Sequence, residues 1–162
     1  MTGARTIQAL VGGSVQFAQG VSSRTVPAAV LGGADAVLIA NFSDKVLFTM
    51  HSGPEINSLQ DLKGKVVGVS GIGGSTDFAT RLALREAGLI PDTDVAIRGV
   101  GGVPETVAAL RAKVVQAGTL SPPSSFVALK AGFKILFDMT RLGVDYVSSG
   151  LGVKESYIVA DR

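Results

Sequence analysis

The sequence contains no cysteine and no tryptophan, and His51 is its only histidine. Without cysteine there is no disulfide, thiolate metal site or cysteine nucleophile, and one histidine cannot build a multi-histidine metal cage. Charged residues make up only 17% of the chain and form no cluster of Lys and Arg. A nucleic-acid interface needs such a basic cluster. We therefore expect no nucleic-acid partner, no metal ion and no other cofactor.

Long apolar runs are also missing. Segments such as 36–40 fall far short of the roughly 20 apolar residues that span a bilayer. The first five residues are polar and lack the apolar core of a leader peptide. The chain is therefore expected to be cytoplasmic if it is the whole gene product, or else an exported protein without its leader. With 162 residues, 46% of them hydrophobic, it is long and apolar enough for a buried core.

Short β-branched segments alternate with segments rich in Ala and Leu, which predicts an α/β fold with mainly parallel strands. The patterns predict helices over 6–11, 23–31, 57–62, 76–87, 104–112 and 124–131. They predict strands over 15–18, 36–40, 46–50, 66–70, 95–98, 114–120 and 133–137, with further strands over 146–149 and 157–160.

The order of these elements predicts two lobes. Residues 65–138 hold four strand–helix alternations, enough for a complete second lobe. Residues 1–55 and 139–162 would form a partial first lobe, with 56–64 as the crossover and hinge. A chain that leaves one lobe and returns to it predicts a cleft.

The strongest candidate site is the glycine-rich turn from Gly71 to Asp77, which follows a buried strand and opens a helix. Bare backbone N–H groups and a helix N-terminus attract anions, and Ser75 and Thr76 add hydroxyl donors. Alternatively, Ser75 only caps the helix and the glycines only make the turn. The turn is not a nucleotide motif, because Thr76 stands where a dinucleotide fingerprint needs glycine and no Gly-Lys-Ser/Thr triplet occurs.

Other polar turns follow neighbouring strands and are weaker candidates. Each has a structural alternative as a turn former, a helix cap or a packing residue. They are Ser121 and Pro122, Ser22 and Ser23, Asn41, and Ser148. No G-x-S-x-G motif occurs, and the spacing of the Asp and Glu residues indicates no catalytic acid pair. We therefore expect no catalytic residues and no enzyme activity.

Four segments together resemble one known family. They are Gln16–Gln19, the run S-x-x-D-L-K-G-K-x-V-G-V from Ser58 to Val69, the Gly-Gly-Ser-Thr-Asp run ending at Asp77, and Leu120–Pro123. Over nearly its whole length the chain resembles the substrate-binding proteins of ABC importers, in the nitrate, sulfonate, taurine and thiamine-precursor-like group.

The resemblance implies a type II periplasmic-binding-protein-like α/β fold, with one complete parallel or mixed-sheet lobe and a partial first lobe. It implies capture of a small polar or anionic molecule, such as a carboxylate or sulfonate, without catalysis. It also implies an ABC permease as partner and a periplasmic or other extracytoplasmic location. The ligand contacts that it implies are Ser22, Ser23, Asn41, Ser70, Gly71, Ser75, Thr76, Ser121, Pro122 and Ser148.

Two departures from the family leave alternatives open. The chain starts after the family's first strand–helix–strand unit and ends before its usual C-terminal helices. The first lobe is then expected to have an unpaired sheet edge, which predicts a homo-oligomer. A second interpretation is a truncated binding-protein fold that no longer binds ligand and acts as an oligomeric interaction protein. A small enzyme on the same fold ranks last, because it would need a reactive histidine and usually a cysteine.

Overall fold

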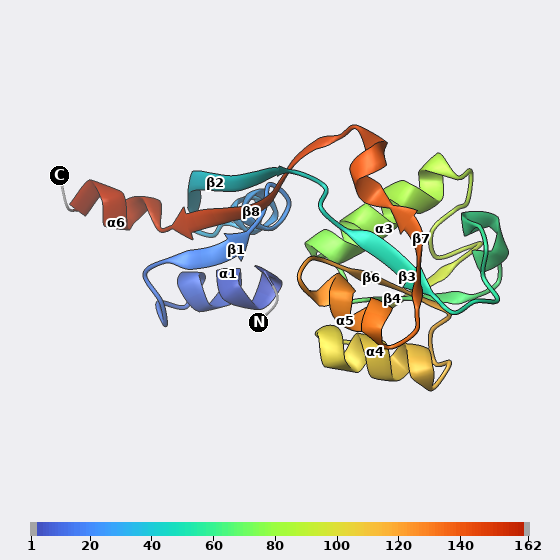
Figure 1. Cartoon of the computed structure of the whole chain (residues 1–162). Helices are drawn as coiled ribbons and strands as arrows, with labels where there is room; N and C mark the ends of the chain where they lie inside the picture. Colours follow the sequence, from blue (N-terminus) through green and yellow to red (C-terminus); the bar gives the residue numbers. More distant parts are fainter. Residues whose placement is uncertain (1–2, 161–162) are drawn as a thin grey trace. The chain divides into compact units, whose positions relative to one another are not determined.

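The computed structural model describes residues 3–160 as an α/β protein (Figure 1). The α-helices are α1 (Gly3–Val11), α2 (Thr25–Leu31), α3 (Ser75–Glu86), α4 (Val103–Arg111), α5 (Ser124–Lys130) and α6 (Glu155–Ala160), and the 3-10 helices are η1 (Leu59–Leu62) and η2 (Met139–Leu142). The strands are β1 (Ala18–Val21), β2 (Val37–Lys45), β3 (Thr49–Ser52), β4 (Val66–Val69), β5 (Ala96–Gly99), β6 (Ala117–Leu120), β7 (Lys134–Asp138) and β8 (Asp145–Val153). Unit 1 comprises Met1–Val46, Gly73–Ser75 and Val144–Arg162, and unit 2 comprises Leu47–Ile72 and Thr76–Gly143.

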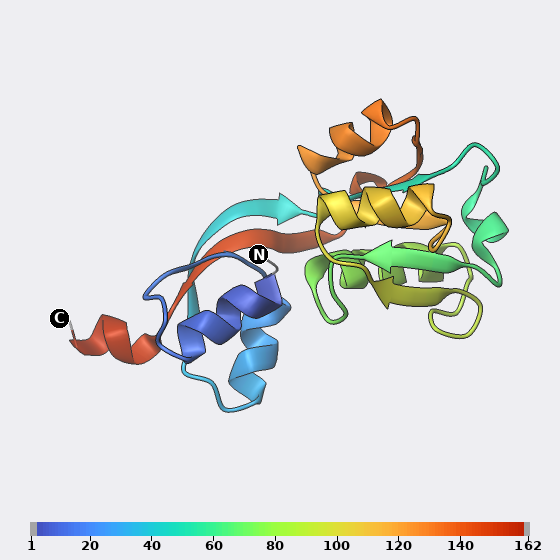
Figure 2. The same cartoon turned by 90° about the horizontal axis from the view of Figure 1, so that it is seen from below.

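Unit 2 is built on a five-stranded sheet in the order β5-β4-β6-β3-β7. Strand β4 runs parallel to β5 and β6, whereas β3 runs antiparallel to β6 and β7. Helix α3 covers one face of the sheet, and α4 and α5 cover the other (Figure 2). The side chains of successive β6 residues point to opposite faces of the sheet. An added Cβ at Gly118 would meet α4, whereas the hydroxyl of Thr119 bonds to α3. The sheet is therefore mixed and covered on both faces.

Unit 1 contains a three-stranded antiparallel sheet in the order β1-β8-β2. Helices α1 and α2 contribute Ile7, Leu10 and Val26 to a buried cluster that also includes Val21 of β1. The strand expected over 15–18 was placed too early, because Val15 and Phe17 are exposed and the paired residues begin at Ala18. Pairing with β8 is a long-range interaction that local pattern does not show.

The expected lobe boundary at residue 55 is corrected by β3. This strand was assigned to the first lobe, but it lies inside the unit 2 sheet, where Met50 is opposite Thr119 of β6 and Phe137 of β7. Met50, His51 and Ser52 are all buried, which requires neighbours on both sides of the strand. Apart from the short segment Gly73–Ser75, which is grouped with unit 1, the chain instead passes between the units after Val46 and after Gly143.

The segment 56–64, expected to be the hinge, lies within unit 2. It folds as η1, and the carboxylate of Asp61 accepts the backbone N–H of Ser58 at 3.0 Å in a capping box. The same carboxylate accepts the backbone N–H of Asn57 at 2.8 Å. The bond from Asn57 first, and then that from Ser58, holds the pKa of Asp61 below its usual range. Ser58 therefore begins a helical turn, as its position before Leu59 predicts.

The strand expected over 157–160 is wrong, since these residues belong to α6. The side chain of Asp35 accepts the backbone N–H of Glu155 at 2.9 Å and that of Ser156 at 3.3 Å. These bonds satisfy donors at the start of α6. Because the capping residue is about 120 positions away, the local sequence carries no sign of it.

Candidate functional site

Two predicted ligand-contact turns leave the unit 2 sheet side by side. Strands β4 and β6 are adjacent and parallel, with Gly68 level with Gly118. Ser70 therefore follows β4 at nearly the same height as Ser121 follows β6. In open α/β sheets, ligands bind at the carboxyl ends of strands. The structure thus brings the predicted residues of both turns, from Ser70 to Thr76 and from Ser121 to Pro122, to one sheet edge.

Thr76 holds the glycine-rich turn closed. Its hydroxyl accepts the backbone N–H of Ser70 at 3.1 Å and lies 2.8 Å from the Ser70 hydroxyl. The Thr76 side chain is buried by the turn. Ser70 and Ser75, in contrast, are half-buried, and Ser75 begins α3. The turn therefore uses Thr76 for its own geometry and leaves the two serines partly accessible.

Sequence reasoning missed a second layer of hydroxyls below this turn. Thr80 of α3 donates to the carbonyl of Thr76 at 2.8 Å, and its oxygen lies 2.7 Å from the hydroxyl of Thr119 on β6. Both threonines are fully buried. The only local sign of this hydroxyl layer in the sequence is the four-residue spacing between Thr76 and Thr80. The layer ties the first turn of α3 to the middle of the sheet.

Open space lies at Gly71. An added Cβ there would meet no atom within 4 Å, whereas one at Gly99 of β5 would lie 3.6 Å from the Gly71 Cα. The turn after β4 therefore rests on the end of β5 at Gly71, and the side of Gly71 on which a Cβ would stand is open. On the β6 side, Ser121 is half-buried and Pro122 is exposed, while the Ser121 carbonyl accepts the backbone N–H of Ser125 at 3.0 Å.

The charge at the start of α3 is balanced within the helix. Asp77 is buried in the first turn, and Arg81 donates to its carboxylate at 2.8 Å. Hydrogen bonding to Asp92, together with Asp77, raises the pKa of Arg81, which therefore stays charged. Asp77 thus places a negative charge in the first turn of α3, which Arg81, one turn later, offsets in part.

In unit 1, the Ser22 side chain bonds to the backbone at the start of α2. Its hydroxyl accepts the backbone N–H of Arg24 and of Thr25, each at 3.3 Å, and the Tyr146 hydroxyl donates to it at 3.1 Å. Ser22 is fully buried. The Ser22 hydroxyl therefore bonds within the fold, as the helix-cap alternative from the sequence allows, and its implied ligand contact stays a prediction. Ser23 is exposed, and its backbone N–H donates to Val147 of β8 at 3.1 Å.

Asn41 and Ser148 are brought together around Ser43. The Asn41 side chain accepts the backbone N–H of Ser43 at 2.9 Å, and the Ser148 hydroxyl donates to the Ser43 carbonyl at 3.5 Å. Asn41 is exposed on β2, and Ser148 is half-buried on β8. The Ser148 bond joins β8 to β2, whereas the Asn41 bond is local to β2, and both side chains thus take the structural alternative that the sequence also allowed.

Within residues 3–160, no three His, Cys, Asp or Glu side chains lie close enough to hold a metal ion. None of the helices in that range has the length and apolar character to cross a membrane.

The chain is similar to one family model and to a set of solved structures. A sequence model described as the NMT1-like family matches residues 6–144. Among curated proteins, none matches significantly. Among similar solved structures, the periplasmic aliphatic sulphonate binding protein SsuA of Escherichia coli has 24% identity and a TM-score of 0.80. The alkanesulfonate-binding protein SsuA of Xanthomonas axonopodis pv. citri, bound to MOPS, has 21% identity and a TM-score of 0.84. The periplasmic nitrate-binding protein NrtA of Synechocystis PCC 6803 has 15% identity and a TM-score of 0.82.

These matches cover 99%, 98% and 98% of this chain, but 54%, 54% and 47% of the three solved chains. The chain therefore spans about half the length of these proteins. At these identities the likeness shows the fold, which confirms the expected periplasmic-binding-protein architecture.

Proposed function

The chain belongs to the NMT1-like family, and from this premise we propose that it is the solute-binding component of an ABC importer, or part of one. It captures a small polar or anionic molecule without changing it chemically, in the periplasm, and passes it to a permease. The observation that carries this proposal is the hydroxyl-lined edge at the carboxyl ends of β4 and β6.

The chemistry of this edge suits a sulfonate or carboxylate. Ser70, Ser75 and Ser121 are half-buried hydroxyl donors, and α3 adds the N-terminus of a 12-residue helix. An anion held there would accept several hydrogen bonds at once. Two of the similar structures are named for binding sulfonates and one for binding nitrate, all of them small anions.

Non-catalytic capture agrees with the position of the single imidazole. His51 is fully buried on β3, and its Nε2 lies 2.8 Å from the Thr49 hydroxyl. A general base must come within about 3 Å of the proton that it removes from a substrate. An enclosed imidazole does not meet that requirement.

Removing two of the accessible hydroxyls should weaken anion binding. For the double variant Ser75→Ala and Ser121→Ala, we expect about tenfold weaker affinity, since each hydrogen bond contributes roughly 0.5–1.5 kcal/mol. Isothermal titration calorimetry with ethanesulfonate, nitrate and acetate would measure it.

Ser14→Ala with Thr93→Ala is the matched control, because both side chains are exposed and lie outside the site. This variant should bind as the parent does. If the parent binds none of the three anions, the binding proposal fails and the interaction-protein interpretation takes its place.

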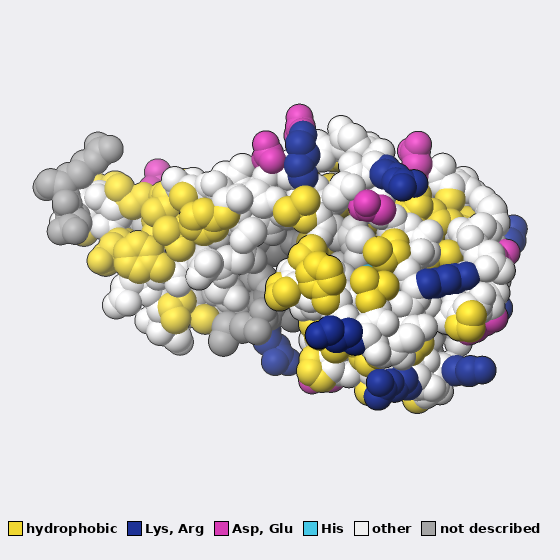
Figure 3. Space-filling view, in the orientation of Figure 1, with side chains coloured by type: hydrophobic (Ala, Val, Ile, Leu, Met, Phe, Trp, Pro, Cys, Tyr) yellow, Lys and Arg dark blue, Asp and Glu magenta, His cyan; other side chains and the backbone are white. Residues whose placement is uncertain are grey.

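We also propose that the chain forms a homo-oligomer through unit 1. Phe17 is 54% exposed and Leu31 is 90% exposed, and Phe17 packs edge-on against Tyr157 at 6.0 Å between ring centroids. Figure 3 shows hydrophobic side chains gathered over α6 and the neighbouring strands of this unit. A net charge of +2 offers little repulsion between copies.

Sedimentation velocity at low micromolar concentration should therefore report a dimer or a larger species. Phe17→Ser should shift the boundary toward the monomer, whereas Ile90→Ser, an exposed apolar residue of unit 2, should not. A parent chain that sediments as a monomer would contradict the oligomer proposal and leave the binding proposal intact.

A further inference from the structure

An apolar groove runs between α4 and α5 on the outer face of the unit 2 sheet, with a volume of about 960 Å³. Val103 and Val107 of α4, Pro123 before α5, and Val127 of α5 contribute to its floor and walls. Small-molecule sites are typically apolar hollows of about 300–1,000 Å³ with a few polar groups. The groove lies at the upper end of that range, and its lining includes neither Ser70 nor Ser121.

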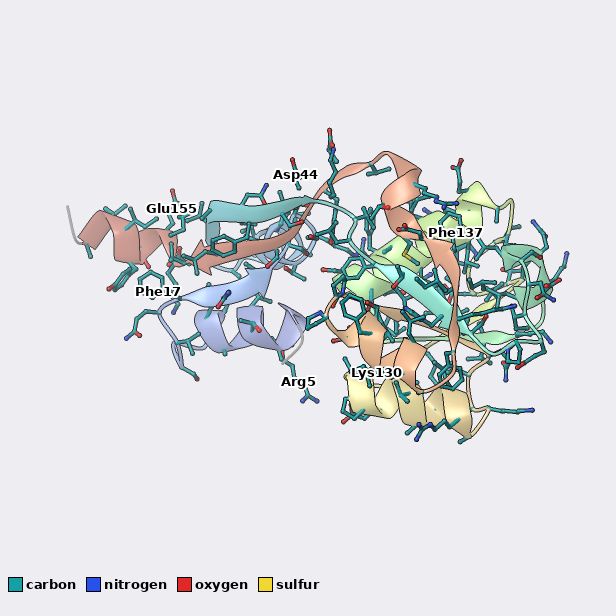
Figure 4. All side chains as sticks on the ribbon, viewed as in Figure 1. Arg5, Phe17, Asp44, Lys130, Phe137 and Glu155 are labelled. Atoms are coloured by element: carbon teal, nitrogen blue, oxygen red, sulfur yellow. The ribbon has the colours of Figure 1, made fainter. Side chains whose placement is uncertain are left out.

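Two cations border the same groove. Arg111 is in the last turn of α4 and Lys130 is in the last turn of α5. Figure 4 labels Lys130 at the end of α5, where α5 lies beside α4. Both residues are exposed, and neither takes part in any of the ion pairs found within residues 3–160. The groove lining contains no acidic side chain among the described residues.

The two helices run in the same direction, because each follows one of the parallel strands β5 and β6 and returns to the next strand. Their C-terminal ends, and so both cations, therefore lie toward one end of the groove. Each helix end carries only about half a negative charge, which is less than the full charge of its Arg or Lys. The net field at this end of the groove is positive.

We propose that this groove is a second binding site, and that its ligand is an amphiphilic anion, a carboxylate or sulfonate with an unbranched alkyl chain. The headgroup pairs with Arg111 and Lys130, and the alkyl chain lies along the valines. Charge complementarity supports an anion, and the apolar walls support the chain. This proposal does not depend on ligand capture at the edge of β4 and β6.

Calorimetry with hexanoate, octanoate and decanoate, kept below micelle-forming concentrations, tests the proposal. Each additional buried methylene should strengthen binding about fourfold. Decyl maltoside has a ten-carbon chain, as decanoate does, but no charge. It should bind at least about tenfold more weakly than decanoate, because it cannot pair with the two cations. Arg111→Gln with Lys130→Gln should weaken decanoate binding by a similar factor.

Matched variants separate the groove from general effects. Val127→Asp places a negative charge in the groove and should abolish decanoate binding, whereas Leu129→Asp, also on α5 but outside the lining, should not. Arg85→Gln with Arg98→Gln removes two exposed cations elsewhere in unit 2 and should leave binding unchanged. When the Val127→Asp and Leu129→Asp variants are compared in a Ser75→Ala, Ser121→Ala background, the proposed solute site is weakened and the difference between them reports the groove.

Three outcomes would overturn the proposal. One is equal binding of decanoate by the Val127→Asp and Leu129→Asp variants. Another is binding of decyl maltoside as tight as that of decanoate, which would remove the role of the cations. The third is no binding of decanoate by the parent, and a changed sedimentation of the Val127→Asp variant would then make the groove an interface between copies of the chain.

Discussion

Replacing Gly150 with valine is expected to unfold the three-stranded sheet of unit 1. Gly150 of β8 is paired with Asn41 of β2, and an added Cβ would lie 2.6 Å from the Leu38 side chain and 2.7 Å from the Ala40 carbonyl oxygen. The carbonyl is backbone, so it moves only if β2 separates from β8. We expect a loss of about 3 kcal/mol, at the upper end of what overpacking usually costs.

Amide hydrogen exchange would locate this effect. Leu151 and Gly152, which follow in β8, should lose their protection, whereas Val67 and Val69 of β4 should keep theirs because all the strand partners of β4 belong to unit 2. Gly71→Ala is the control, since its new methyl group would meet nothing within 4 Å. Normal protection of Leu151 in the valine variant would show that β2 and β8 have room that the Cβ position does not indicate.

The parts of the fold that the sequence predicts well are those with strong local patterns. The expected strand over 66–70, which has no polar residue before Ser70, became β4, and the helical spacing of apolar residues over 76–87 became α3, each within a residue or two. Pro104 lies in the first helical turn of α4, as its missing N–H predicts. At these positions propensity, periodicity and burial all favour the same structure.

The errors fall where a distant partner decides the structure. The segment 157–160 has strand-forming residues, but Asp35 caps it as part of a helix. Strand β3 was expected in the first lobe by its place in the chain, yet its buried residues pair with strands about 70 and 85 positions later. Local propensity cannot report such contacts, and tertiary packing overrides it.

The candidate site shows the same division. A glycine-rich turn after a buried strand was enough to find the edge at Ser70 and Gly71. It was not enough to separate serines that face outward from serines that bond inward. Ser22 and Ser75 both precede or begin a helix, but only Ser22 is enclosed, because Tyr146 reaches it from β8, 124 positions away.

Lowering the pH from 7 to 5 is expected to destabilise the folded chain through His51. Burial lowers the pKa of this imidazole below its ordinary 6.5. Its Nδ1 is buried without a hydrogen-bond partner, so the fold gains nothing from a second N–H. The neighbouring β7 residues Asp138 and Lys134 pair with Thr49 and Ser52, at the two ends of β3, rather than with His51.

The sign follows from proton binding. Between the lowered pKa and 6.5, the unfolded chain binds a proton that the folded chain does not, so the free energy of unfolding falls as the pH falls. The limiting slope is about 1.4 kcal/mol per pH unit, and the loss between pH 7 and pH 5 reaches about 2 kcal/mol when the folded imidazole stays neutral throughout. Urea unfolding at several pH values would measure it.

His51→Gln has no titrating group and should remove this dependence between pH 7 and pH 5. The Asp61→Asn variant should keep the pH dependence between pH 7 and pH 5. The pKa of the Asp61 carboxylate is lowered, so its protonation, which removes the capping interaction of η1, affects stability only at more acidic pH. A parent and a His51→Gln variant with the same slope would mean that the buried imidazole is protonated in the folded chain. A partner for its Nδ1 would then have to form as β3 adjusts, and the Thr49 contact alone would no longer explain how the sheet tolerates this residue.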